Sequence, residues 1–248
     1  MKTKVMFVGL LAVAGLAMGQ KVKSKNEQEA LMAVLNATSP DAKISAVDNL
    51  IAKYKDTEFK AVALAMAAEA AQQKGDSPTA IVYGNRALEA DAKNFQAMLL
   101  VAGQLAQTTR EFDLDKDEKV KRATTLSNDA IAAVNAAAKP NPQLTDDQWA
   151  GIKKDLIAQS HETLGVLASV DKKWDAAIAE FKTAVEGEST PEPTTMLRLA
   201  ATYNNAKQYD QATAMADQVL ALPSAPDKFK KIAQDEKQRA AKLKAGTK

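Results

Sequence analysis

The stretch that decides the fold is KKWDAAIAEFKTAV at residues 172–185, which follows HETLGVLASVD at residues 161–171. Within the first stretch, aromatic and small residues recur at spacings of three and four: Trp174, Ala177, Phe181 and Ala184. Such spacing places the side chains on one face of an α-helix. Because two antiparallel helices approach closely only where the facing residues are small, we expect Gly165 and Ala177 to lie at a helix–helix contact.

The same pattern occurs twice more, in TAIVYGNRALEADAKN at residues 79–94 and in QATAMADQVLALPSAP at residues 211–226. When the three stretches are aligned, two columns seven residues apart hold small or apolar residues: Ala80, Ala177 and Ala212, then Ala87, Ala184 and Val219. The turn signals KGDSP, VDKK and NNAKQ precede these columns. Each unit is therefore predicted to be a helix, a tight turn and a second helix. No convincing strand pattern occurs, so the chain is predicted to be all-α.

These units resemble the tetratricopeptide repeat (TPR). The family's pattern is matched in full by Leu164-Gly165, Trp174, Ala177, Phe181 and Ala184, and in most positions by Leu199-Ala200, Tyr203, Tyr209 and Ala212. The resemblance implies a right-handed superhelical solenoid of about five antiparallel helix pairs. Stacking of such pairs buries apolar faces that a single pair leaves exposed.

The predicted repeats divide the chain into consecutive parts. Clear repeats are placed at 61–94, 158–192 and 193–225, with a degenerate one at 27–60 and another, with insertions, from Phe95. The predicted domains are a signal peptide at 1–19, repeats at 20–108, an irregular insertion at 109–157, repeats at 158–225, and a basic capping helix and tail at 226–248. In the insertion, Thr145 and Gln148 form a predicted capping box at the start of a long helix.

The first 19 residues have the pattern of a secretory signal, with Lys2 and Lys4 before the apolar stretch Val5–Met18 and a small-residue cleavage site before Gln20. We therefore expect an exported protein, periplasmic or secreted, without a transmembrane segment. Removing this segment takes away two lysines and no acid, which leaves 31 basic and 31 acidic residues. A mature net charge near zero gives no reason to expect a nucleic-acid partner.

Several kinds of active site are excluded or disfavoured by the composition. The chain has no cysteine, and its single histidine, His161, is expected to have a structural role. The acidic run Asp113–Glu118 resembles the start of a calcium loop, but Glu118 and Thr124 stand where that loop needs glycine and glutamate. An extended acidic turn is the preferred interpretation, and weak cation binding there is left open. We expect no catalytic residue, metal or cofactor, and hence no enzyme.

A partner groove is implied by the resemblance, because the first helices of TPR pairs line a surface that holds a peptide. The residues carried over to it are Met66, Glu69, Gln73, Leu99, Leu100, Gly103, Gln107, Glu162, Val166, Leu197, Arg198, Ala201 and Asn205. Part of the family clamps a partner's terminal carboxylate with Lys, Asn and Arg; only Arg198 fits that pattern, and Glu69 would repel a carboxylate. A helical or extended segment suits the mixed apolar and amide positions better.

The sequence thus favours a non-enzymatic scaffold or adaptor of the bacterial cell envelope with a protein or peptide partner. Weak self-association is left open. The alternative is a factor that associates with an anionic surface or polysaccharide through the basic segment from Asp227 to Lys248, which carries eight Lys or Arg and three acids. Capping of the last repeat is the preferred role for that segment.

Overall fold

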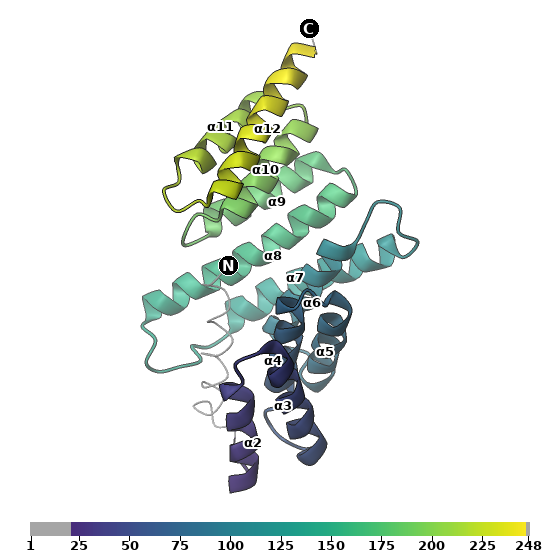
Figure 1. Ribbon diagram of the computed structural model, residues 1–248, viewed down its shortest axis with the longest axis vertical. Helices are drawn as coiled ribbons and strands as arrows, with labels where there is room; N and C mark the ends of the chain where they lie inside the picture. Colours follow the sequence, from purple (N-terminus) through teal and green to yellow (C-terminus); the bar gives the residue numbers. More distant parts are fainter. Residues whose placement is uncertain (1–20, 247–248) are drawn as a thin grey trace. The chain divides into compact units, whose positions relative to one another are not determined.

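The computed structural model describes residues 21–246, and this part of the chain contains helices and no strand (Figure 1). The helices are α2 (Lys25–Asn36), α3 (Pro40–Lys53), α4 (Lys60–Gln73), α5 (Ser77–Ala90), α6 (Phe95–Thr108), α7 (Lys116–Ala136), α8 (Asp146–Val170), α9 (Trp174–Gly187), α10 (Pro193–Asn205), α11 (Tyr209–Ala221) and α12 (Asp227–Gly246). The predicted all-α class is confirmed. The predicted signal segment, residues 1–19, lies outside the described residues.

The chain divides into two compact units. The N-terminal unit comprises the described residues up to Thr108 together with Asn128–Ala150, and the C-terminal unit comprises Thr109–Ser127 and the described residues from Gly151 onward. In the N-terminal unit each helix from α2 to α6 packs on the next one, and α4 also packs on α6. In the C-terminal unit α9, α10, α11 and α12 pack in the same consecutive way, and α10 also contacts α12. The last helix therefore caps the unit as the first helix of a further pair would.

The helix ends follow from local sequence. The Ser24, Ser39 and Asp76 side chains accept hydrogen bonds from backbone N–H groups in the first turns of α2, α3 and α5. The predicted capping box is present, because Thr145 N–H donates to Gln148 Oε1 at 2.9 Å and Gln148 N–H donates to Thr145 Oγ1 at 3.1 Å. These contacts satisfy N–H groups that have no partner within the helix.

The tight turns inside the helix pairs share one backbone geometry. Gly75, Lys172 and Lys207 have φ of 76°, 56° and 62°, which is the left-handed region. After each of them, a backbone N–H reaches back to a carbonyl five residues earlier, at 3.0, 2.9 and 2.8 Å. This arrangement ends a helix and satisfies its last carbonyls. It lets the second helix of a pair start immediately beside the first.

The core is built where the repeat columns predict it. The six aligned positions, Ala80, Ala87, Ala177, Ala184, Ala212 and Val219, are all fully buried. At the crossing of α8 and α9, a Cβ added to Gly165 would lie 2.8 Å from Cδ1 and Cε1 of Phe181. The Phe181 ring is itself buried, so it cannot move aside. The predicted contact at Gly165 is therefore confirmed, and it requires glycine.

Replacing Gly165 tests this close approach. Gly165→Ala should lower the free energy of unfolding by about 1–3 kcal/mol, because the methyl group overpacks a filled interior. The matched control is Gly151→Ala in the same helix, where an added Cβ meets nothing within 4 Å. Alanine has the higher helix propensity, so this control should raise the free energy of unfolding by up to about 1 kcal/mol. Urea denaturation followed by circular dichroism measures both; equal effects would contradict the contact.

Candidate functional site

An apolar hollow lies between α2 and α4 in the N-terminal unit. Every side chain that lines it is hydrophobic: Leu31, Val34, Leu35, Phe59, Val62, Ala63 and Met66. Leu31 and Leu35 stand one turn apart on α2, and Val62 and Met66 stand one turn apart on α4. Leu35 and Val62 are only half-buried, so they remain accessible at the surface. The hollow is therefore a place where apolar side chains of two successive first helices reach the surface together.

The hollow continues along α4 to a charged pair. Glu69 and Gln73 follow Val62 and Met66 at spacings that keep all four on one helix face. The Lys43 Nζ donates to the backbone carbonyls of Val34 at 3.0 Å and Leu35 at 3.4 Å, which fixes a cation at the end of α2. Glu69 lies close enough to Lys43 for the two charges to affect each other.

Burial controls the charge of this pair. Burial raises the pKa of the Glu69 carboxyl to about 7, and the attraction of Lys43 offsets only part of that effect. Burial also lowers the pKa of Lys43, with Glu69 acting in the opposite direction. Near neutral pH, Glu69 is therefore divided between its ionised and protonated forms, and the α4 face can present either an acceptor or a donor.

In the C-terminal unit, the predicted groove residues are already engaged within the chain. Arg198 Nη1 donates to Glu162 Oε1 at 2.9 Å, which joins α10 to α8. Arg239 Nη2 donates to Asn205 Oδ1 at 2.6 Å, which joins α12 to α10. Leu197 is buried in a cluster with Met196, Ala216, Val219 and Ala233. A carboxylate-bearing ligand would therefore have to compete with Glu162 for Arg198.

The predicted groove residues differ in how accessible they are. Met66, Leu99, Leu100 and Leu197 are buried; Glu69, Gly103, Glu162, Val166, Arg198 and Ala201 are half-buried; Gln73, Gln107 and Asn205 are exposed. The structure brings Met66, Glu69 and Gln73 together on α4. Sequence reasoning missed Leu31, Leu35 and Val62, although the one-turn spacing of the two leucines was a usable signal.

His161 and the acidic run Asp113–Glu118, which the sequence offers as candidate sites, form polar contacts within the chain. His161 Nδ1 lies 2.7 Å from Glu180 Oε2 and joins α8 to α9. In the acidic turn, Lys119 Nζ lies 2.8 Å from Asp115 Oδ1 and 3.5 Å from Asp113 Oδ2. Within residues 21–246 no three His, Asp or Glu side chains gather so as to hold a metal ion. In the same range, no helix combines the length and the hydrophobicity that crossing a membrane requires.

Comparison with solved structures identifies the fold. A thermophilic TPR protein from Thermus thermophilus aligns with a TM-score of 0.57 and 16% identity, over 85% of this chain and 98% of that one. A MamA RS-1 double mutant aligns with a TM-score of 0.53 and 13% identity, over 91% of this chain and 98% of that one. No protein-family model matches the sequence, and comparison with curated proteins finds no significant match. The chain therefore has the tetratricopeptide-repeat fold, as its repeat columns predict.

The raised pKa of the Glu69 carboxyl should make the stability of the protein depend on pH. Its pKa is raised from 4.5 to about 7 in the folded chain, so the folded state holds the proton more tightly than the unfolded state does. The free energy of unfolding should therefore fall as the pH rises from about 4.5 to about 7. Glu69→Gln should remove this slope and stabilise the protein at pH 8 by about 1–3 kcal/mol.

Denaturant titrations at pH 5, 6, 7 and 8 measure that slope, and Glu29→Gln on the exposed side of α2 is the matched control. The control should keep the wild-type slope. Identical slopes for wild type and Glu69→Gln would contradict the role given to Glu69.

Proposed function

We propose that this chain is a non-enzymatic scaffold or adaptor that binds a segment of a partner protein along the first helices of its pairs. The observation that carries the proposal is the hollow between α2 and α4, because its two half-buried apolar residues, Leu35 and Val62, would gain free energy if a partner covered them. Stacked helix pairs supply extended binding surfaces of this kind. Repeat folds serve many functions, so the fold alone does not assign this role, and the hollow is the feature that favours it.

The hollow favours a particular partner chemistry. An amphipathic helix could place apolar residues against Leu35 on α2 and Val62 on α4, the two lining residues that remain accessible. Glu69 extends this face with a carboxyl whose burial disfavours its charge. A partner that supplies a cation or a hydrogen-bond acceptor at this point would satisfy one of the two forms of Glu69.

The setting we propose is the bacterial cell envelope. Its support is the amino-terminal pattern of two lysines, an apolar stretch and a small-residue cleavage site. The absence of cysteine from the sequence is compatible with an oxidising compartment, because no thiol is left to form unwanted disulfides.

Site-specific photocrosslinking tests the proposed groove. A photoreactive phenylalanine analogue at Gln73, which is exposed at the end of the hollow, should cross-link a discrete partner in envelope extract. Val62→Asp should reduce this cross-link more than tenfold, since it places a charge in the apolar contact. The matched control is Val82→Asp on α5, where the valine is 54% exposed.

The control variant should cross-link as wild type does, and both variants should keep wild-type helicity. Persistence of the cross-link in Val62→Asp, or its loss in both variants, would argue against the hollow as the binding site.

A second candidate function has its own supporting observation on α12. Lys230, Lys231 and Lys242 have no acidic partner among residues 21–246, whereas Lys237 pairs with Asp217 at 2.7 Å. Unpaired lysines attract an anionic membrane surface or polysaccharide.

Vesicle co-sedimentation tests this second candidate. Lys231→Glu combined with Lys242→Glu should weaken binding to vesicles rich in anionic lipid by about tenfold or more. Point variants are preferable to deletion of the helix, because α12 covers α10 and α11. Equal binding to anionic and zwitterionic vesicles would contradict an electrostatic surface.

A further inference from the structure

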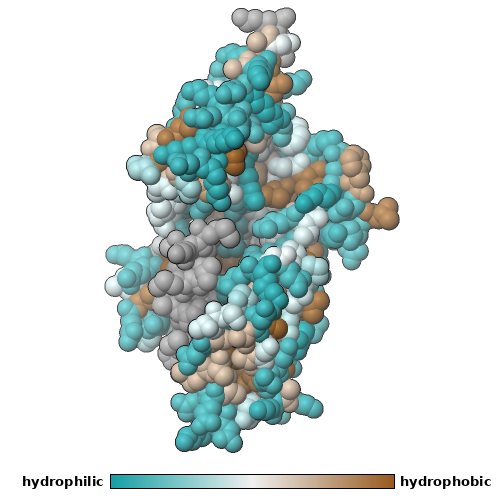
Figure 2. Space-filling model, in the orientation of Figure 1, coloured by the Kyte–Doolittle hydropathy of each residue, from teal (hydrophilic) through white to brown (hydrophobic). Residues whose placement is uncertain are grey.

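Two hydrophobic side chains project from the turn between α6 and α7. Phe112 is 88% exposed and Leu114 is fully exposed, while the other large hydrophobic residues at the surface of residues 21–246 are at most 54% exposed. In Figure 2, brown side chains stand out from the edge of the molecule where Figure 1 shows this turn. Paired exposure of this extent is informative, since single and partial exposure is ordinary for apolar residues.

Hydrogen bonds inside the turn hold its backbone. Arg110 N–H donates to Asp113 Oδ2 at 2.9 Å, and Lys116 N–H donates to the Asp113 carbonyl at 3.2 Å. The Arg110 N–H and the nearby Lys119 keep the pKa of Asp113 below its usual value. Asp113, which stands between the two hydrophobic residues, is therefore ionised and fixed at neutral pH.

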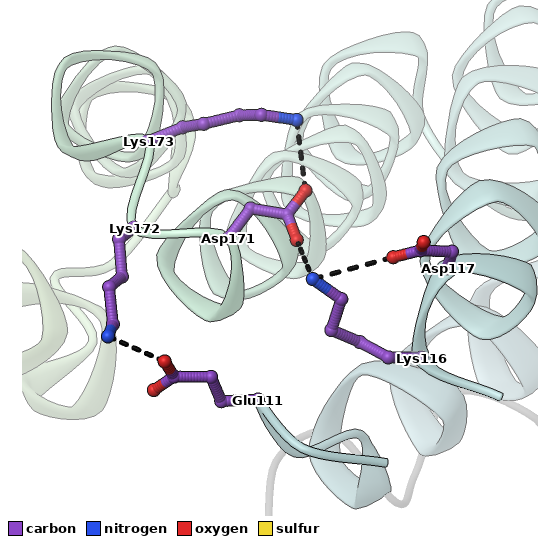
Figure 3. A network of polar contacts seen from close by, with 6 residues as sticks. All are labelled: Glu111, Lys116, Asp117, Asp171, Lys172 and Lys173. Carbon is purple, nitrogen blue, oxygen red and sulfur yellow. Dashed lines mark hydrogen bonds and ion pairs between the residues drawn. The ribbon is translucent and has the colours of Figure 1, made fainter. Parts of the chain in front are cut away.

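Ion pairs also hold the turn against the loop that joins α8 to α9 (Figure 3). Lys172 Nζ lies 2.6 Å from Glu111 Oε1, and Lys116 Nζ lies 3.0 Å from Asp171 Oδ1. Lys173 Nζ contacts the second oxygen of Asp171 at 2.9 Å. These contacts lie on both sides of Phe112 and Leu114 in sequence. The two side chains are thus exposed on a backbone that is already ordered, which lowers the entropy cost of binding through them.

The charges around Phe112 and Leu114 indicate which kind of surface can bind these two side chains. Residues 110–118 contain five acidic and two basic residues, and some of the acids have partners outside this range, because Glu111 pairs with Lys172 and Asp113 and Asp115 pair with Lys119. The side chains of Asp115 and Asp117 are nevertheless 55% and 95% exposed, whereas those of Lys116 and Lys119 are 25% and 27% exposed. The exposed charge of residues 110–118 is therefore mainly negative. An anionic membrane would be repelled by this excess, whereas an apolar surface surrounded by lysines would complement it. We name Phe112, Leu114 and their acidic neighbours in residues 110–118 the acidic tip.

The exposed face of α12 has the complementary character. Residues 227–246 contain seven Lys or Arg and three acids, and the basic residues include lysines without an acidic partner among the described residues. Ile232 and Leu243, 43% and 39% exposed, lie eleven residues apart and hence on the same side of the helix. Lys231 and Lys242 each adjoin one of these apolar residues. The helix therefore presents apolar groups among charges that are mostly positive, with Asp235 as an exposed acid on the same side as Ile232.

We propose that the acidic tip of one molecule binds the exposed face of α12 on a second copy of this chain. Both surfaces belong to the C-terminal unit, and both remain uncovered within it. Because the two surfaces differ, a single contact is head-to-tail and leaves one tip and one α12 face free, whereas a two-fold dimer would use both contacts at once. A contact with only two exposed hydrophobic side chains on each surface is smaller than the interface of a stable dimer, so association is weak, and it weakens further with salt.

Disulfide trapping tests the contact directly, because the natural chain has no cysteine. Purified Leu114→Cys and Ile232→Cys proteins with different tags are mixed and oxidised. The mixed disulfide should form at least tenfold faster than with the control pair, Val82→Cys and Ile232→Cys. Adding Lys231→Glu and Lys242→Glu to the Ile232→Cys partner, or raising the salt from 50 to 500 mM, should slow the reaction severalfold.

Sedimentation equilibrium gives an independent readout on cysteine-free protein. Wild type should show a mass that increases with concentration, and Phe112→Ser combined with Leu114→Ser should remain monomeric with wild-type helicity. Val62→Asp in the hollow should leave the association unchanged, which separates this proposal from the proposed partner groove.

Three results would overturn the proposal. One is trapping no faster than in the control pair. Another is a wild-type protein that stays monomeric at the highest concentration reached. The third is binding of anionic vesicles through Lys231 and Lys242 without any self-association, which would assign the α12 face to a membrane surface instead.

Discussion

Close approach of paired helices is the constraint on which the rest of the structure depends. At the crossing of α8 and α9, the buried ring of Phe181 occupies the space that a side chain at position 165 would need. The α5–α6 contact has the same character, because a Cβ at Gly84 would lie 2.4 Å from Val101 Cγ2. The aligned alanines are fully buried as well, and their small side chains allow helices to approach closely. With no disulfide available, the fold is stabilised by many such small contacts distributed along the chain.

This way of packing explains why the candidate site contains a titrating acid. Helix α4 packs against α3, α5 and α6, and most of its buried residues are alanines. Glu69 is the only charged residue between Lys60 and Lys74, so its carboxyl lies in a largely apolar environment. Burial there raises its pKa, and Lys43 is the one group that acts to lower it. The same alanine-rich helix therefore provides both the apolar hollow and the raised pKa.

The sequence predicts the local features of the fold well because they depend on spacing within one helix pair. The capping box at Thr145 and the contact at Gly165 are examples, and both are confirmed. The site is less predictable, because a resemblance assigns residues to a face without deciding how deeply each is covered. Leu197 is buried in the core, while its neighbour Arg198 pairs with Glu162. The sequence places both residues on the groove face, and only the packing of the helices shows that their surroundings differ. Leu35 and Val62 lie 27 residues apart in sequence, so their shared hollow depends on how two pairs stack.

The ion pairs around the acidic tip illustrate the same limit and a further point. Glu111 and Lys172 are separated by 61 residues, and nothing in the sequence around either residue predicts that the two side chains pair. Both side chains are well exposed, so their pairing contributes little to the free energy of folding. The ion pair instead holds the turn between α6 and α7 next to the loop that joins α8 to α9. The turn thus keeps its place while two hydrophobic side chains remain in solvent, and this arrangement is the basis of the proposed self-association.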